Sequence, residues 1–140
     1  MKRAILVLCL LSMTIVLFTA CGSTAKNPYK DLSAEDISSA TVELRPPHVT
    51  VDLSEEEIQE LVAVLQTVET YEKDNSYSDY AGQGVIYTLT KTDGSTEKIM
   101  AYNPFLVIND VGYKTKYEPC EELNALGNTT AKTPFGRQTD

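Results

Sequence analysis

Apolar and polar residues alternate along the stretch from residue 40 to residue 53, with one interruption. Apolar side chains occupy every second position from 40 to 44, and the same spacing resumes from 49 to 53. A period of two is typical of strands that bury one face. Prolines at 46 and 47 separate the two runs, because proline cannot donate to a strand ladder. We therefore expect either two strands here or one strand that resumes after a kink at a sheet edge.

The apolar period lengthens to 3.6 residues directly after this region, which predicts an amphipathic helix. Ser54 and Glu57 have the spacing of a capping box, with Ser54 as the N-cap. Glu55 and Glu56 add negative charge where the helix dipole is positive. The helix is expected to end near Tyr71. Its apolar stripe consists of Ile58, Leu61, Val62, Leu65 and Val68.

Two hairpins follow a polar loop. Residues 85–91 and 95–102 flank a Thr-Asp-Gly turn, for which two registers are conceivable. A two-residue turn would place Leu89 beside Lys98. A three-residue loop with Gly94 in the left-handed conformation makes a better apolar face, so we expect that register. The face would then contain Val85, Tyr87, Leu89, Ile99 and Ala101.

The second hairpin is expected from residues 105–108 and 113–117 around the loop 109–112, and a short helix from Cys120 to Leu126 is expected to end at Gly127. Tight hairpins imply an antiparallel sheet, and one amphipathic helix implies packing on one of its faces. The predicted fold class is α+β: a small antiparallel sheet of about five to six strands packed against one amphipathic helix, with a short C-terminal helix.

The N-terminus has the order of an export signal. Lys2 and Arg3 precede an apolar run over residues 5–18, which is too short for a membrane-spanning helix of about 20 residues. The run ends in Leu-Phe-Thr-Ala-Cys21, which resembles the lipobox of bacterial lipoproteins. That resemblance implies cleavage before Cys21, a diacylglycerol on its sulfur, often a further acyl chain such as palmitate, and anchoring to the extracytoplasmic side of the bacterial cell membrane. Two acyl chains suffice for stable anchoring.

The predicted organisation therefore has four parts. Residues 1–20 are the lipoprotein signal peptide, and residues 21–34 are the lipidated cysteine and a flexible tether. Residues 35–127 form a single α+β domain. Residues 128–140 show no apolar period and are expected to be disordered.

Charge and cysteine content narrow the function classes. Cleavage would remove Lys2 and Arg3 and leave 10 basic against 20 acidic residues, a formal charge near −10. Such a domain is repelled by nucleic acid, so no nucleic-acid partner is expected. Only Cys120 remains for the domain, which excludes an internal disulfide. With one cysteine and one histidine, His48, a zinc site with several soft ligands is also excluded, and no cofactor is expected.

The stretch from Ala101-Tyr-Asn-Pro-Phe through Tyr117-Glu-Pro-Cys120 loosely resembles small uncharacterised lipoproteins of low-GC Gram-positive bacteria. This resemblance implies no known activity. One enzymatic alternative would pair Cys120 with His48. Three glutamates surround Cys120 and would raise its pKa, so a buried packing role is the simpler interpretation. No catalytic residue is assigned, because the chain also lacks G-x-S-x-G, S-x-x-K, P-loop and H-E-x-x-H motifs.

The polar loop offers a weak calcium pattern. Asp74, Ser76 and Ser78 match the first, third and fifth positions of an EF-hand loop, but Asp79 and Val85 stand where Gly and Glu are required. Glutamates at 55–57 and 121–122 lie at expected helix starts, where capping explains them. A solvated acidic loop is therefore expected, and no metal site is assigned.

Tyrosine is the one compositional excess, with 8 in the chain and no Trp. Exposed tyrosines make good contact surfaces because they present a large area with few rotatable bonds. Four form the candidate partner surface: Tyr77, Tyr80, Tyr113 and Tyr117. We expect a non-catalytic binding, accessory or sensor module that contacts a protein or cell-wall partner. The alternatives are a small extracytoplasmic enzyme using Cys120 and His48, and a structural surface lipoprotein.

Overall fold

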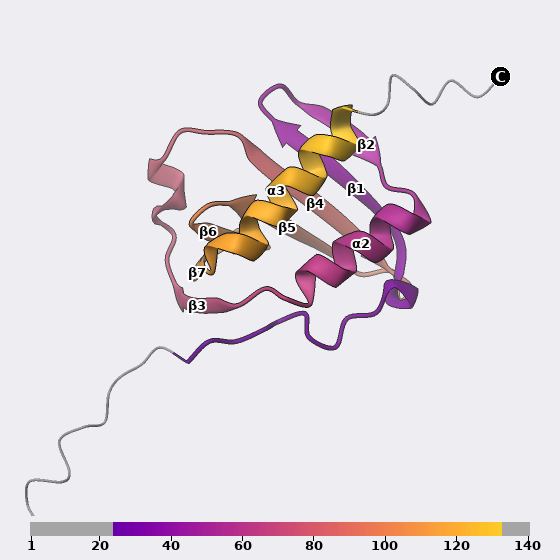
Figure 1. Ribbon diagram of the computed structural model, residues 1–140, viewed down its shortest axis with the longest axis horizontal. Coiled ribbons are helices and arrows are strands. Elements are labelled where there is room, and N and C mark those ends of the chain that lie inside the picture. The colour runs from indigo at the N-terminus through magenta and orange to yellow at the C-terminus, as the bar shows by residue number, and fades with distance from the viewer. Residues whose placement is uncertain (1–23, 133–140) are drawn as a thin grey trace, which may run out of the picture.

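One antiparallel sheet organises the chain. The computed structural model describes residues 24–132, and within them seven strands pair in the order β2-β1-β4-β5-β6-β7-β3 (Figure 1). The strands are β1 Ile37–Arg45, β2 Val49–Asp52, β3 Thr70–Lys73, β4 Gly84–Lys91, β5 Thr96–Tyr102, β6 Phe105–Ile108 and β7 Val111–Thr115. The predicted α+β class is confirmed. The sheet has seven strands, where five to six were expected, because β3 lies in a segment interpreted as helix end and loop.

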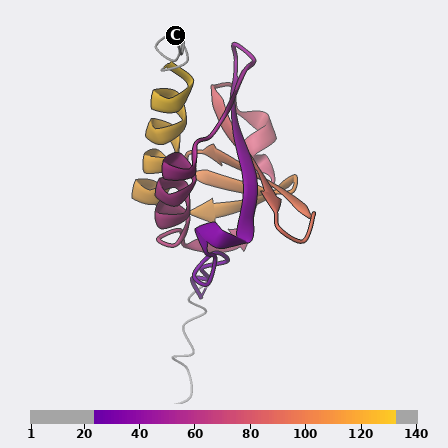
Figure 2. The same cartoon turned by 90° about the vertical axis from the view of Figure 1, so that its right-hand side faces the viewer.

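Two helices cover one face of the sheet, which we call the helix face. They are α2 Glu55–Leu65 and α3 Tyr117–Lys132, and two short 3₁₀ turns, η1 Ala34–Asp36 and η2 Ser76–Asp79, complete the described elements. Figure 2 shows α2 and α3 on one side of the strands and the loop containing η2 on the other. The other face of the sheet, which we call the open face, therefore carries a loop in place of a helix.

Helix α2 begins as predicted and ends earlier than predicted. The Ser54 side chain accepts from the Glu57 N–H, and the Glu57 carboxylate accepts from the Ser54 N–H, so the capping box is confirmed. The helix stops at Leu65, not near Tyr71. Val68 is nevertheless fully buried, from a turn in which its N–H donates to the Leu65 carbonyl. The helical spacing of apolar residues therefore extends beyond the end of α2, because the turn that contains Val68 faces the same core.

The first hairpin has the predicted register. Val85 pairs with Ala101 and Tyr87 pairs with Ile99, which puts the expected apolar residues on the helix face. Gly94 has a φ of 85°, the left-handed conformation that the three-residue loop requires. The second hairpin is tighter than expected. Asn109 and Asp110 form its turn with φ of 47° and 67°, so β7 starts at Val111.

The C-terminal boundary was predicted wrongly. Gly127 does not end a helix, and residues 128–132 belong to α3, which runs from Tyr117 to Lys132. A Cβ at Gly127 would collide with Val85 and lie 3.0 Å from the Tyr87 hydroxyl. The glycine therefore lets α3 approach the sheet closely, and the contact stabilises a helix that propensity alone would not continue. Residues 133–140 lie outside the described part of the chain.

The N-terminal boundary also differs. The segment 21–34 was expected to be a flexible tether, but its described part packs on the domain from Lys26 onward. Lys26 and Thr70 exchange two backbone hydrogen bonds of 2.8 Å. Tyr29 is 4% exposed and belongs to the core. Burial of its ring supplies the free energy that holds this segment on the domain. The polar composition of the segment had instead indicated a tether.

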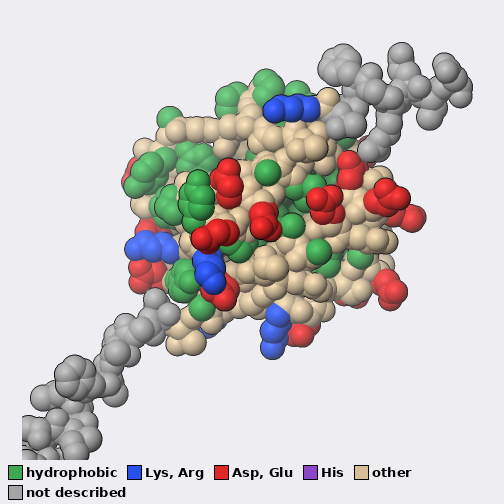
Figure 3. Space-filling view, viewed as in Figure 1, with side chains coloured by type: hydrophobic (Ala, Val, Ile, Leu, Met, Phe, Trp, Pro, Cys, Tyr) green, Lys and Arg blue, Asp and Glu red, His purple; other side chains and the backbone are tan. Residues whose placement is uncertain are grey.

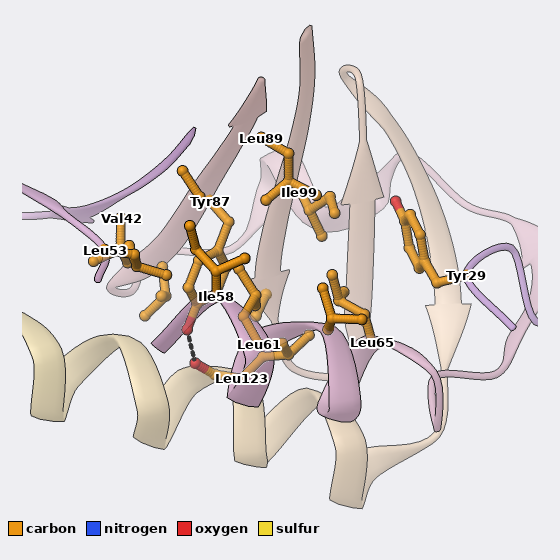
Figure 4. Close-up of a cluster of buried hydrophobic side chains, with 14 of the residues drawn as sticks. Tyr29, Val42, Leu53, Ile58, Leu61, Leu65, Tyr87, Leu89, Ile99 and Leu123 are labelled. Atoms are coloured by element: carbon orange, nitrogen blue, oxygen red, sulfur yellow. Dashed lines mark hydrogen bonds between the residues drawn. The ribbon is translucent and has the colours of Figure 1, made fainter. Parts of the chain in front are cut away.

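The core lies between the helix face and the two helices (Figure 4). Side chains from α2 interdigitate with those of the central strands β4 and β5. Leu61, Leu65, Tyr87, Leu89 and Ile99 are among its fully buried large residues.

Candidate functional site

A row of directly paired residues crosses the open face from β1 to β7. Ile86 of β4 pairs with Met100 of β5, and Met100 pairs with Val107 of β6. Directly paired residues point to the same side of a sheet. The row continues to Glu43 at one end and to Gly112 at the other. No helix covers these strands on this side within the described residues, so three apolar side chains form the floor of a shallow groove.

The loop with η2 makes one wall of this groove. The Asp74 N–H donates to the Gly112 carbonyl at 2.9 Å, and the Gly112 N–H donates to Asn75 Oδ1 at 2.8 Å. The Tyr77 hydroxyl donates to the Asp110 carbonyl at 3.3 Å. A Cβ on Gly112 would lie 2.7 Å from the Tyr77 ring, so only glycine allows this close crossing. The loop therefore holds the Tyr77 ring over the end of the apolar row.

Charged side chains form the opposite wall. Arg45 donates to both carboxylate oxygens of Glu43, at 2.6 Å and 3.1 Å. These hydrogen bonds lower the pKa of Glu43, and Glu43 in turn raises the pKa of Arg45. Lys98 and Asp110 complete the rim, and the groove has a volume of about 190 Å³. The site thus combines an apolar floor with a rim that carries both signs of charge.

The four predicted tyrosines do not form one surface. Tyr77 lines the groove, and Tyr80, which is 61% exposed, contacts Phe105 with 5.7 Å between ring centroids and a tilt of 48° between the rings. Tyr113 pairs with Leu106 of the core, so it lies on the helix face. Tyr117 is 60% exposed at the start of α3. The structure therefore brings Tyr77 and Tyr80 together on the open face and separates them from the other two.

Cys120 and His48 are not brought together. Cys120 is fully buried in the first turn of α3, and its thiol donates to the Phe105 carbonyl at 3.4 Å. Burial raises its pKa to about 12. His48 is exposed in the β1–β2 turn, with Nδ1 3.6 Å from the Glu43 carboxylate. His48 thus lies beside Glu43 of the open face, whereas Cys120 in α3 packs against Phe105 of β6. This arrangement offers no thiol–imidazole pair.

The acidic segments serve structural roles. Asp74 accepts from the Ser76 N–H at 2.9 Å, and its hydrogen bonds with Ser76 lower the pKa of Asp74. Glu121 accepts from Asn103 Nδ2 at 3.0 Å. Within residues 24–132, no group of three or more His, Cys, Asp or Glu side chains is placed to hold a metal ion. Acidic side chains also gather over α2 and α3 (Figure 3), where Glu57, Glu60 and Glu122 border the furrow between the helices.

Sequence reasoning missed the groove floor. The signal was present: Ile86 and Met100 stand beside the core positions Tyr87 and Ile99, and residues 105–108 are apolar without alternation. A strand that is apolar on both sides needs cover on both faces. Here the second face is covered in part by the η2 loop and in part left as the groove.

Cys21, which is expected to carry the lipid, lies outside the described residues. Among the residues that are described, no helix is long and apolar enough to cross a bilayer. Comparisons of the chain with protein-family models, with curated proteins and with solved structures found no match.

Proposed function

We propose that this chain is a membrane-anchored extracytoplasmic lipoprotein whose domain is a non-catalytic binding module. Its contact surface is the groove on the open face, and its partner is an extended segment of another protein. The observation that carries the proposal is the apolar row Ile86–Met100–Val107, which no helix covers among residues 24–132 and which lies between Tyr77 and the Glu43–Arg45 pair.

The composition of the groove favours a polypeptide over other ligands. Protein interfaces combine an apolar centre, enriched in Met and aromatic residues, with a polar rim. The groove has this arrangement, with Met100 at its centre and Tyr77 at its wall. Opposite charges at the rim, Arg45 and Lys98 against Glu43 and Asp110, suit the mixed charges and backbone dipoles of a peptide better than a uniformly charged ligand.

The membrane anchor rests on the lipobox-like sequence that ends in Cys21. A Cys21→Ala variant should lose lipid labelling and remain uncleaved at this position. Labelling that persists in this variant would overturn the anchor assignment. The anchor residue and the groove residues are far apart in the sequence. The anchor assignment and the groove assignment can therefore be refuted independently of each other.

The groove is tested by crosslinking in native membranes. Met100→Glu would place a charge on the apolar floor, and it should abolish a crosslinked protein partner that wild type captures. Gln59→Glu, on the exposed side of α2, is the matched control and should capture the partner as wild type does. Tyr77→Ala tests the groove wall, and Tyr80→Ala tests the aromatic ring beside it. Equal capture by Met100→Glu and wild type would refute the groove as the contact surface, provided that circular dichroism shows both to be folded.

A further inference from the structure

We infer that one edge of the domain is held directly against an anionic lipid surface. In this orientation the strand order runs away from the membrane, with β3 nearest to it and β2 farthest from it. This inference rests on the proposed lipidation of Cys21. We call this surface the proximal edge and define it as residues 26–31, 69–74 and 111–116. These residues comprise the N-terminal segment that packs on the sheet, the strand β3 with its flanks, and the strand β7.

The first step is that the chain is fastened to the proximal edge at Lys26. Lys26 and Thr70 exchange two 2.8 Å backbone hydrogen bonds, and the Thr70 hydroxyl donates to the Lys26 carbonyl at 3.1 Å. Asn27 donates to the Gln66 carbonyl at the end of α2. The buried Tyr29 hydroxyl donates to Glu97 at 3.2 Å. The chain is therefore attached to the sheet from Lys26 onward, and Figure 1 shows its first described residues beside β3.

The second step is the reach of the residues that remain. Five residue steps separate Cys21 from Lys26. A fully extended chain spans at most about 3.6 Å per residue, so these steps reach at most about 18 Å. The headgroup layer of one leaflet takes up about 5 to 7 Å of that distance. Lys26, and with it β3, must therefore lie within a few residue lengths of the lipid headgroups.

The third step is charge complementarity. The proximal edge carries five lysines against four acids: Lys26, Lys30, Lys73, Lys114 and Lys116 against Asp31, Glu69, Glu72 and Asp74. The other described residues carry four basic and fifteen acidic side chains. Lys26 and Lys73 are exposed, and neither is paired with an acid among the described residues. An anionic bilayer attracts lysines near its surface and repels acidic groups within a Debye length. The proximal edge can therefore approach such a bilayer with less electrostatic repulsion than the acidic remainder of the domain.

The orientation determines where a partner can approach. Six strand spacings of about 4.8 Å separate β3 from β2, so β2 stands about 29 Å farther from the lipid. The groove crosses the strands, with Tyr77 at the end nearer the membrane and the Glu43–Arg45 pair at the outer end. A partner would therefore enter the groove from the β1–β2 hairpin, which lies at the corner of the domain opposite β3 in Figure 1.

The test measures how close two exposed positions are to lipid. The full chain is produced in a bacterium that lipidates it and is reconstituted in vesicles of phosphatidylcholine with phosphatidylglycerol. A fluorophore is attached at Lys73→Cys on β3 or at Thr50→Cys on β2, and a headgroup-linked quencher is added to the lipid. We expect severalfold stronger quenching at position 73 than at position 50. Equal quenching at both positions would overturn the inference.

Two variants separate the causes. A long Gly-Ser insertion after Gly22 should reduce the difference between the two positions, since it removes the limit on reach. Lys26→Ser with Lys116→Ser should also reduce it, whereas Lys132→Ser, at the end of α3 and outside both the proximal edge and the groove, should leave it unchanged. A chain that carries lipid and floats with vesicles but shows equal quenching refutes only the orientation. A chain that carries no lipid on Cys21 and does not float overturns both the anchor and the orientation.

Discussion

The hydroxyl of Tyr87 donates a 2.6 Å hydrogen bond to the backbone carbonyl of Leu123, and this bond joins the centre of the sheet to α3 (Figure 4). Both residues are fully buried. The bond satisfies the one polar atom of a tyrosine that otherwise packs like an apolar residue. It also fixes the height of α3 above the strands at the point where Gly127 makes its closest approach.

Tyr87→Phe should lower the free energy of unfolding by about 1 kcal/mol. The substitution removes the donor and keeps the ring, and the Leu123 carbonyl retains its acceptor role within the helix, so neither partner is left unsatisfied. Urea denaturation measures the change. Tyr71→Phe is the control, because its 3.4 Å contact with Glu69 is only partly buried, and it should be near neutral. If Tyr87→Phe lowers the free energy of unfolding no more than the control does, the Tyr87 hydrogen bond makes no net contribution to stability.

Gly127→Ala should destabilise the domain by about 1 to 3 kcal/mol, although alanine is the better helix former by about 1 kcal/mol. The added methyl would meet Val85 and lie 3.1 Å from Val42, two fully buried side chains of neighbouring strands. Thermal unfolding checks the sign. Glu122→Ala, exposed on the same helix, should change stability little. A stabilised Gly127→Ala variant would mean that α3 can lift away from the sheet without loss.

Leu61→Ala and Leu65→Ala should each cost about 2 to 5 kcal/mol, because both side chains are fully buried between α2 and the sheet. Denaturant midpoints, with Gln59→Ala as the exposed control on the same helix, measure the difference. Near-neutral values would contradict the packing of α2 on the helix face.

Stability should fall as the pH rises above about 9 to 10. Burial raises the pKa of Tyr29, where Glu97 adds to the effect, and burial also raises the pKa of Tyr87 and of Cys120. In the unfolded chain these groups ionise near their ordinary values of 10 for tyrosine and 9 for cysteine. The unfolded state then binds fewer protons than the folded state, and each such group lowers stability by about 1.4 kcal/mol per pH unit.

Denaturation measured at a series of pH values checks this slope. The combined variant Tyr29→Phe with Tyr87→Phe should show a shallower decline above pH about 10, because two of the three buried acids are gone. An unchanged slope in this variant would show that these hydroxyls ionise in the folded state as readily as in the unfolded state.

Cys120 should resist thiol reagents in the folded protein. Its sulfur is fully buried, and its raised pKa keeps it protonated at neutral pH. Reaction with a chromogenic disulfide should be slow in buffer and rapid in denaturant. Fast modification under native conditions would show that the first turn of α3 opens readily.

Local patterns predicted the elements whose signals are contained in a few adjacent residues. The Ser54–Glu57 capping box, the Gly94 turn and the alternation of Val85 and Tyr87 depend on hydrogen bonds and burial set by neighbours in the chain. The sequence alone therefore placed the start of α2, the strands β4 and β5, and the register between these two strands. The same local reasoning identified the α+β class. It also grouped Tyr77, Tyr80, Tyr113 and Tyr117 as one surface, although it could not show that only Tyr77 and Tyr80 share a face.

Contacts between distant segments decided the rest. Strand β3 forms because its backbone pairs with β7 and Lys26, and α3 continues through Gly127 because the sheet lies close beneath it. The segment from Lys26 to Tyr29 packs on the domain because Tyr29 is buried in the core. The groove likewise exists only where β1, β4, β5 and β6 lie side by side under the η2 loop. The free energy that orders these parts comes from surfaces that residues far apart in the chain bury together, and a local pattern does not contain that information.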